Sequence, residues 1–252
     1  FKNILKMGKI ITIANFKGGV GKTTSAINIG SGLSRRRKKV LLVDMDPQYN
    51  LTQSLGITDP QQTIYQALIN KAQIKPIEKT KGLDVLPSSL ELIRAEIELS
   101  GELKREYILS NIIAPFKPIY DFIIIDCPPS LGLLTLNSFF ASDYIYIPIE
   151  AEYLALKGYT ILNEAINKIG LEIDKVFITK YDSRKILNRN VTESIKENLG
   201  HKAFKTVIRD NISLAEAPAK GVDIFTYNDK CNGAQDYFYL TKEVISHCKT
   251  GK

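Results

Sequence analysis

The sequence has few cysteines and no long apolar run. Its three cysteines, Cys127, Cys231 and Cys248, are too few and too scattered for a disulfide framework or a C-x-x-C metal site. No apolar run approaches the ~18 residues that a membrane span requires, and no segment has the pattern of a signal peptide. We therefore expect a cytoplasmic protein that works in a reducing compartment and does not bind membranes.

The composition is that of a folded α/β protein. The chain has 252 residues, of which 44% are hydrophobic, and this is enough for one domain whose sheet is buried on both faces. We predict a single domain over residues 1–252, with residues 1–6 disordered or a non-native start that precedes Met7. The formal net charge of +7 favours a polyanionic partner, although the same charge could serve solubility alone.

A glycine-rich segment between a predicted strand and a predicted helix is the strongest motif. It follows the apolar run 10–14 and precedes the helical pattern 22–36. Its glycines let the backbone curl so that successive N–H groups point inward, and the helix adds the positive end of its dipole, which suits phosphate. We expect the Lys22 ammonium between the β- and γ-phosphates of a nucleotide and the Thr23 hydroxyl on Mg²⁺. The predicted nucleotide contacts are Gly18, Gly19, Val20, Gly21, Lys22, Thr23 and Thr24.

Aspartates follow two further apolar runs. Asp44 and Asp46 follow the run 40–43, and Asp126 ends the run 122–126. Unbroken apolar runs are typical of parallel strands covered on both faces, and ligands bind at the carboxyl ends of such strands. We predict that Asp46 holds the attacking water and that Asp126 orders Mg²⁺ through water. The predicted fold class is a single-domain α/β P-loop fold, a mostly parallel twisted sheet with helices on both faces.

These motifs resemble the boxes of one ATPase family. The loop has Phe16 where the usual pattern has its first glycine, and it carries a second lysine, Lys17. Its form, K-G-G-x-G-K-S/T-T, resembles the deviant Walker A box of the ParA/MinD ATPases. The segments 44–50, 126–130 and 150–158 resemble the D-x-D-P-Q-G-N, D-x-P-P-S and Q-x-E-Y-x-A-L-x-G boxes of that family. Tyr49 replaces a glycine and Glu150 replaces a glutamine.

The resemblance implies a ParA/Soj-type partition ATPase with ATP and Mg²⁺ as cofactors. In that family the early lysine, which Lys17 matches, reaches the nucleotide of a partner subunit, and the second aspartate of the D-x-D box, which Asp46 matches, supports hydrolysis. We add Pro218, in a segment that resembles the E-A-P box, to the cofactor-binding residues. The implied protein is a nucleoid-associated homodimer that forms with ATP, binds double-stranded DNA non-specifically and is released by slow hydrolysis, which a ParB-like partner stimulates.

A basic segment supplies the predicted DNA contacts. Residues 180–220 contain nine Lys or Arg against five Asp or Glu. In the ParA branch the corresponding face binds DNA, and counterion release would supply the affinity. Ser213 stands where many members have the arginine credited with DNA contact, and Asp210 where another arginine is common. A solvated basic face is the alternative. The predicted DNA contacts are Arg184, Lys185, Arg189, Lys205, Arg209 and Lys220.

Two other functions stay open. A MinD-like membrane-positioning ATPase would need a lysine-rich amphipathic tail. The polar side of the helix predicted over 233–248 lacks a lysine-rich stripe, so we expect its apolar positions, Phe238 among them, to pack on the sheet. A nucleotide-binding regulatory protein without hydrolysis would show no phosphate release that depends on Asp46.

Four smaller expectations concern single segments or residues. We expect a polar linker over 74–80, a helix cap at Ser88, a purely local role for the cations 35–39 at a helix end, and no redox role for Cys127.

Overall fold

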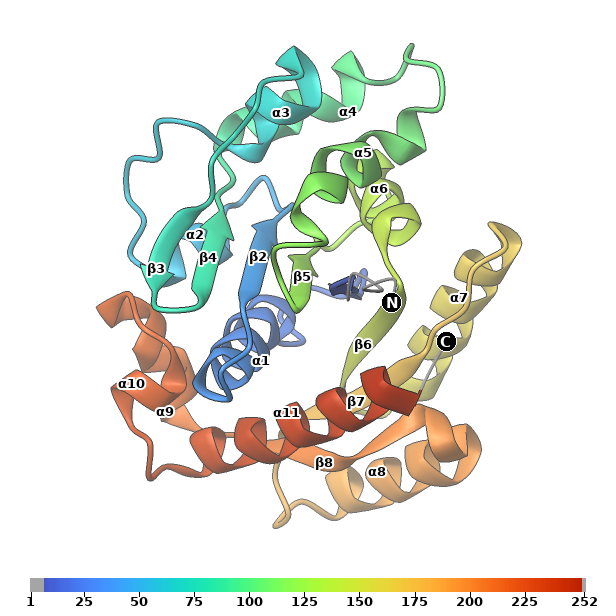
Figure 1. The fold of residues 1–252 in the computed structure, drawn as a ribbon. Coiled ribbons are helices and arrows are strands. Elements are labelled where there is room, and N and C mark those ends of the chain that lie inside the picture. Colours follow the sequence, from blue (N-terminus) through green and yellow to red (C-terminus); the bar gives the residue numbers. More distant parts are fainter. Residues whose placement is uncertain (1–6, 251–252) are drawn as a thin grey trace, which may run out of the picture.

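One eight-stranded sheet organises the chain (Figure 1). The computed structural model describes residues 7–250, without the side chain of Thr250, so the expectation for residues 1–6 lies outside the described residues. The strand order is β3-β4-β2-β5-β1-β6-β7-β8, and all neighbours are parallel except β3 and β4. The strands are β1 (Lys9–Ile13), β2 (Val40–Asp44), β3 (Ile77–Thr80), β4 (Leu83–Leu86), β5 (Phe122–Asp126), β6 (Tyr144–Glu150), β7 (Lys175–Tyr181) and β8 (Ala203–Arg209).

Helices make most of the connections between strands. The α-helices are α1 (Lys22–Arg35), α2 (Asn50–Ser54), α3 (Ile64–Asn70), α4 (Ala95–Glu98), α5 (Ile108–Ile113), α6 (Leu133–Ala141), α7 (Ala155–Lys168), α8 (Ile186–Leu199), α9 (Ile212–Glu216), α10 (Ile224–Tyr227) and α11 (Asn232–Thr250). Short 3-10 helices are η1 (Leu90–Arg94), η2 (Arg105–Tyr107), η3 (Ala114–Phe116), η4 (Gly200–Lys202) and η5 (Ala217–Lys220).

The sheet is buried on both faces, as the unbroken apolar runs predict. Successive residues of β2 alternate between two cores, because Leu41 and Val43 pack in one and Val40 and Leu42 in the other. Side chains from α3 to α8 cover the first face, and side chains from α1, α2, α10 and α11 cover the second. Each fully buried Leu or Ile contributes about 1.5–3 kcal/mol relative to exposure. The predicted mostly parallel sheet with helices on both faces is confirmed.

Strand β1 lies at the point where the strand order reverses. It pairs with β5 on one side and with β6 on the other, while β2 lies beyond β5. Open α/β sheets bind ligands at such a switch point, outside the carboxyl ends of the strands. The fold therefore places the loop after β1 next to the ends of β2 and β5.

Three smaller expectations are wrong. Part of the segment predicted as a linker forms β3, a half-exposed edge strand antiparallel to β4. Ser88 caps no helix: η1 begins after Ser89, and the Ser88 hydroxyl donates to the Asp46 carbonyl at 2.8 Å. Helix α11 packs against β8 as predicted and also against α1 (Figure 1), but Phe238, expected on its packed face, is 44% exposed.

The cations at the end of α1 have local partners. Arg35 donates to Thr226 at 2.8 Å, Arg36 lies over the ring of Phe238, and Lys38 pairs with Asp121 at 3.7 Å. These contacts fit the local role expected for this cluster better than a nucleic-acid patch.

Candidate active site

The loop between β1 and α1 is held open by left-handed glycines. Gly19 has φ +74° and Gly21 has φ +85°, a region that residues with a Cβ rarely adopt. Gly21 is also the N-cap of α1, and no side chain caps this helix end. The Thr179 hydroxyl of β7 donates to the Val20 carbonyl at 2.9 Å and fixes the loop from outside. The first N–H groups of α1 are therefore left for a ligand, and the helix dipole favours an anion.

This loop forms one wall of a cavity of about 400 Å³, here called the phosphate-loop cavity. It is lined by Gly18, Gly19, Gly21, Lys22, Thr23, Thr24, Ile27, Asn28, Asp46, Gln48, Asn50, Ser54, Pro129, Lys180, Leu214, Ala217, Pro218 and Val222. The structure thus brings together all the predicted nucleotide contacts except Val20, whose side chain is buried beneath the loop with 1% exposure.

Lys22 is a buried lysine that has no carboxylate within salt-bridge distance among the described residues. Its ammonium donates to the Lys17 carbonyl at 3.2 Å. Burial lowers the pKa of Lys22, and the nearby carboxylate of Asp126 opposes this shift. A buried ammonium with unsatisfied donors is suited to bind a phosphate oxygen.

Asp126 fits a metal site. Its side chain is fully buried at the end of β5, yet neither carboxylate oxygen has a hydrogen-bond partner among the described residues. Burial, and next the neighbouring Asp44 carboxylate, raise the pKa of Asp126 well above its usual range. An unpartnered buried carboxylate is suited to a hydrated cation. Within residues 7–250 no group of three or more His, Cys, Asp or Glu side chains could hold a metal, so Mg²⁺ would also need oxygens from a nucleotide.

Asp44 and Asp46 differ in role although they are two residues apart. The Asp44 carboxylate is fully buried and accepts from the backbone of Asp46 at 3.1 Å and from the Thr52 hydroxyl at 2.7 Å, so it holds the following loop in place. Burial raises the pKa of Asp44 to about 7. Asp46 lines the cavity, while its carbonyl is fixed by Ser88. Tyr49, where a glycine was expected, keeps a left-handed φ of +44°.

Lys17 points toward acids of its own chain. Its ammonium pairs with Glu152 and, at 3.3 Å, with Glu150, both at the end of β6 or just after it. The hydrogen bond that Lys17 donates to Glu152 is the main reason why the pKa of Lys17 is raised. Lys17 is not among the described residues that line the phosphate-loop cavity. The two lysines of the loop therefore face different directions.

The predicted DNA contacts do not form a single cluster. Arg184, Lys185 and Arg189 follow β7 at the cavity end of the sheet, and Lys220 ends η5. Lys205 lies near the amino end of β8, four residues or about 13 Å before Arg209. Arg184 pairs with Asp182 at 2.9 Å, Arg189 donates to the Ser183 carbonyl, and Arg209 pairs with Asp236 at 2.6 Å.

Two positions named for DNA binding look different in the structure. Arg209 is held by three contacts from its guanidinium to Asp236 and one to Gln235, so it is the least available of the predicted cations. Ser213, at the position of a family arginine, is buried and adds no charge.

Cys127 lies in the core. Its burial raises the pKa of the thiol, so little reactive thiolate forms near neutral pH.

Sequence reasoning missed Lys180 as a site residue. It was counted only in the basic segment, but it lines the phosphate-loop cavity and pairs with Glu150 at 3.7 Å. The pattern that could have identified it is a cation at the carboxyl end of a predicted parallel strand.

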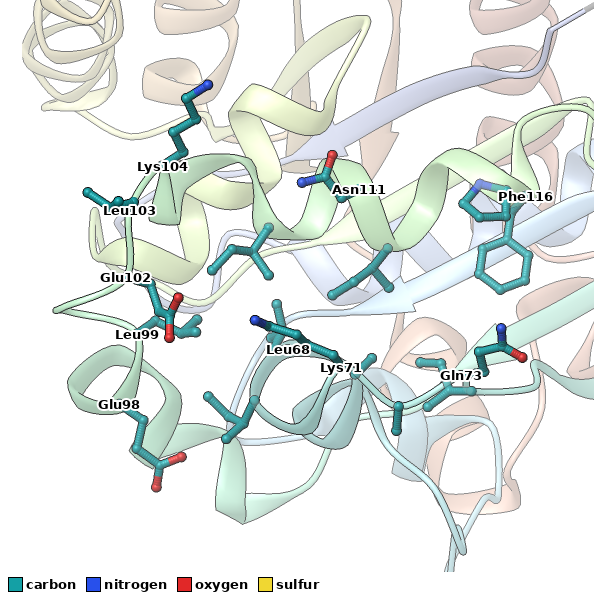
Figure 2. Close-up of a pocket in the computed structure, with 17 residues that line it drawn as sticks. Leu68, Lys71, Gln73, Glu98, Leu99, Glu102, Leu103, Lys104, Asn111 and Phe116 are labelled. Atoms are coloured by element: carbon teal, nitrogen blue, oxygen red, sulfur yellow. The ribbon is translucent and has the colours of Figure 1, made fainter.

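A larger hollow lies on another part of the molecule. The α3–α5 groove has a volume of about 790 Å³ and runs between α3 and the segment η2–α5–η3 (Figure 2). It is lined by Ala67, Leu68, Ile69, Lys71, Ala72, Gln73, Ile74, Glu98, Leu99, Glu102, Leu103, Lys104, Ile108, Asn111, Ile112, Pro115 and Phe116. Figure 2 shows Glu98, Glu102 and Lys104 near one end, Lys71 between the ends and the ring of Phe116 near the other end. None of the predicted site residues lies there.

No helix within residues 7–250 combines the length and the apolar character needed to cross a membrane.

Comparisons with known proteins agree with this geometry. A family model described as an AAA domain matches residues 8–178. The chain is 42% identical over 249 residues to the chromosome-partitioning ATPase Soj of Treponema pallidum, covering 95% of this chain and 98% of that protein. Cobyrinic acid a,c-diamide synthase from Mycobacterium smegmatis, solved with ADP and magnesium, has a TM-score of 0.84 at 30% identity, with 98% of this chain and 97% of that chain covered.

A second solved structure is that of a MinD protein, the alternative that the sequence analysis left open. The septum site-determining protein MinD from Pyrococcus horikoshii, complexed with Mg-ADP, has a TM-score of 0.82 at 25% identity and covers 98% of this chain and 100% of that one. The nearly full-length match to Soj is the stronger similarity. Together with the family model and the phosphate-loop geometry, it shows that the chain belongs to the ParA/Soj family of P-loop ATPases.

Proposed function

We propose that this ATPase, whose cofactors are ATP and Mg²⁺, works in DNA partition as a homodimer that closes over two nucleotides and binds DNA in the closed state. The observation that carries the proposal is the direction of Lys17. It belongs to the phosphate loop but lies against Glu150 and Glu152 and outside its own cavity. A cation that points away from its own cavity could reach the nucleotide of a second copy once it leaves these two glutamates.

Exposed apolar side chains near the cavity support the proposal that a second copy covers this face of the protein. Leu131 follows the Pro129 that lines the cavity, and Tyr153 and Leu154 follow the acids that hold Lys17. Their exposures are 41%, 82% and 62%. Burial of such side chains against another copy would contribute favourably to association.

The chemistry we propose is in-line attack of water on the γ-phosphate. Lys22 and the backbone N–H groups of the loop bind the phosphates, and Asp46 holds the water. Thr23 and Asp126 would hold Mg²⁺, which when bound neutralises phosphate charge. Pro218 lines the other wall of the cavity, where the nucleoside would lie.

Lys17 is tested by size-exclusion chromatography with light scattering in the presence of ATP. The wild-type protein should dimerise with ATP and not with ADP. Lys17→Ala should bind ATP as a monomer and fail to dimerise, whereas Lys157→Ala, at an exposed lysine of α7, should dimerise normally. An ATP-dependent dimer of Lys17→Ala would contradict the role in trans.

DNA binding is tested with ATP and a duplex of arbitrary sequence. Arg184 is the most exposed of the paired arginines, with 88% of its side chain accessible, against 36% for Arg209. We expect Arg184→Ala to weaken binding and to lower the slope of log affinity against log salt by about one per subunit, and Arg209→Ala to have a smaller effect. An unchanged slope in both variants would mean that DNA binds at another surface of the protein.

Turnover and release are tested by phosphate release. Asp46→Ala should stop release and keep the DNA-bound dimer, and a ParB-like protein should accelerate release by the wild type. Normal release by Asp46→Ala would exclude Asp46 from hydrolysis.

Two results would favour the alternative functions. Binding to anionic vesicles in preference to DNA would favour the MinD-like ATPase, and the absence of any phosphate release by the wild type would favour the regulatory protein.

A further inference from the structure

Lys180 and its neighbour Thr179 both reach the phosphate loop, which a regular strand would not allow. Successive side chains of a strand point to opposite faces. Thr179 packs its Cγ2 about 3.7 Å from where a Cβ on Gly21 would lie, and the Lys180 ammonium lies 4.0 Å from the corresponding point on Gly19. The backbone of β7 therefore departs from regular geometry at this position.

The departure is visible in the backbone. Lys180 has φ +50°, in the left-handed region, and the register between β7 and β8 shifts between Ile178 and Tyr181. A left-handed conformation in a residue with a long side chain costs on the order of 1–2 kcal/mol and tends to occur at functional sites. Here it directs an ammonium toward the loop that holds phosphates.

The charge of Lys180 is only loosely compensated. Its contact with Glu150 is 3.7 Å long, and half of its side chain is accessible. Glu150 also contacts Lys17, at the shorter distance of 3.3 Å. One carboxylate thus serves two ammonium groups, and Lys180 lies at the edge of the phosphate-loop cavity with its charge available.

We propose that Lys180 is a further nucleotide-contacting residue, a second ammonium that binds the phosphate chain of the nucleotide held by its own subunit. Glu150 holds the Lys180 side chain near the cavity and competes with the phosphates for its charge. Lys22 binds from beneath the loop, and Lys180 binds from the β7 side.

The test measures the affinity of ATP, ADP and AMP by isothermal titration calorimetry with Mg²⁺, for the wild type, Lys180→Met and Lys180→Arg. Removing the ammonium should weaken ATP and ADP about five- to tenfold and AMP by less than twofold, because a charge-assisted hydrogen bond is lost to a phosphate that AMP lacks. Lys180→Arg should restore most of the affinity. The ATP affinity of Lys180→Met should also depend less on salt.

The matched control is Lys168→Met, which removes an exposed lysine at the end of α7 and should leave all three affinities unchanged. Glu150→Gln should tighten ATP binding two- to fivefold, since the competing carboxylate is removed. A Lys180→Met protein that binds ATP as tightly as the wild type would overturn the proposal. So would equal losses for AMP and ATP, or a Glu150→Gln variant that weakens ATP, because each result would mean that the pair only supports the loop.

Nucleotide binding by the wild type is the reference for every comparison. If it fails, the assignment of the cavity fails, whereas intact wild-type binding with an unaffected Lys180→Met excludes only the role of Lys180.

Discussion

The phosphate-loop cavity and the α3–α5 groove differ in lining as well as in volume, and the smaller of the two carries the chemistry. The groove is larger, about 790 Å³ against 400 Å³, but most of the residues that line it are apolar. The cavity collects free backbone N–H groups, a buried lysine and Asp46, with Asp126 buried at the adjacent strand end. Convergent polar groups therefore identify a site better than volume does.

The largest effect should come from the lysine of the cavity. Lys22→Ala should abolish measurable ATP binding, because it removes a buried ammonium that lines the cavity. Lys104→Ala, at a lysine of the groove, should leave ATP binding unchanged. Fluorescence titration with a labelled nucleotide measures both. Equal affinities for the two variants would remove the distinction between the regions.

A second difference is the burial of charge near the cavity. Burial raises the pKa of Asp44 to about 7, from about 3.9 in an unfolded chain, which is about a thousandfold gain in proton affinity. Folding therefore favours the protonated carboxyl. The contribution of Asp44 to stability is fully present below pH 4 and is lost as pH rises through 7, with an upper limit of about 4 kcal/mol.

The titration can be followed directly. Carbon-13 NMR of the aspartate carboxyl groups without nucleotide, with the Asp44 resonance assigned from Asp44→Asn, should give a midpoint near pH 7. A midpoint near pH 4 would mean that the site does not bury this charge.

In the groove, substitution of a buried side chain should lower the stability of the fold and leave nucleotide binding intact. Leu68 is 1% exposed, so Leu68→Ala should lower the free energy of unfolding by about 2–4 kcal/mol, measured by urea denaturation. Leu103 is 94% exposed, so Leu103→Ala should stay within about 0.5 kcal/mol of the wild type. Loss of ATP affinity in folded Leu68→Ala would mean that packing in the groove affects nucleotide binding in the phosphate-loop cavity.

The smallest effect concerns the metal. Asp126→Asn should reduce the gain in ATP affinity that Mg²⁺ provides about tenfold, as expected for a carboxylate that acts through water. With a chelator present, both proteins should bind ATP within twofold of each other. An undiminished response to Mg²⁺ would place the metal away from Asp126.

Much of the fold could be predicted because its core strands are unbroken apolar runs. The runs that end at Asp44 and Asp126 correspond to β2 and β5, and the glycine spacing located the loop after β1. Strand β3 was missed because an edge strand with one exposed face has no such run. The DNA contacts were grouped by their proximity in sequence, which could not reveal that β8 separates Lys205 from Arg209 or that Asp236 holds Arg209.

The sequence by itself determined the chemistry of the loop, because phosphate binding depends on local backbone freedom at Gly19 and Gly21 and on the lysine that follows. Only the tertiary structure decided which charges are free. The partners of Lys17 lie more than 130 residues away, Asp126 is buried without a hydrogen-bond partner among the described residues, and Lys180 reaches the loop through a kink in β7. Local conformation follows from neighbouring residues, whereas charge compensation and burial arise from side chains that meet only when the sheet assembles.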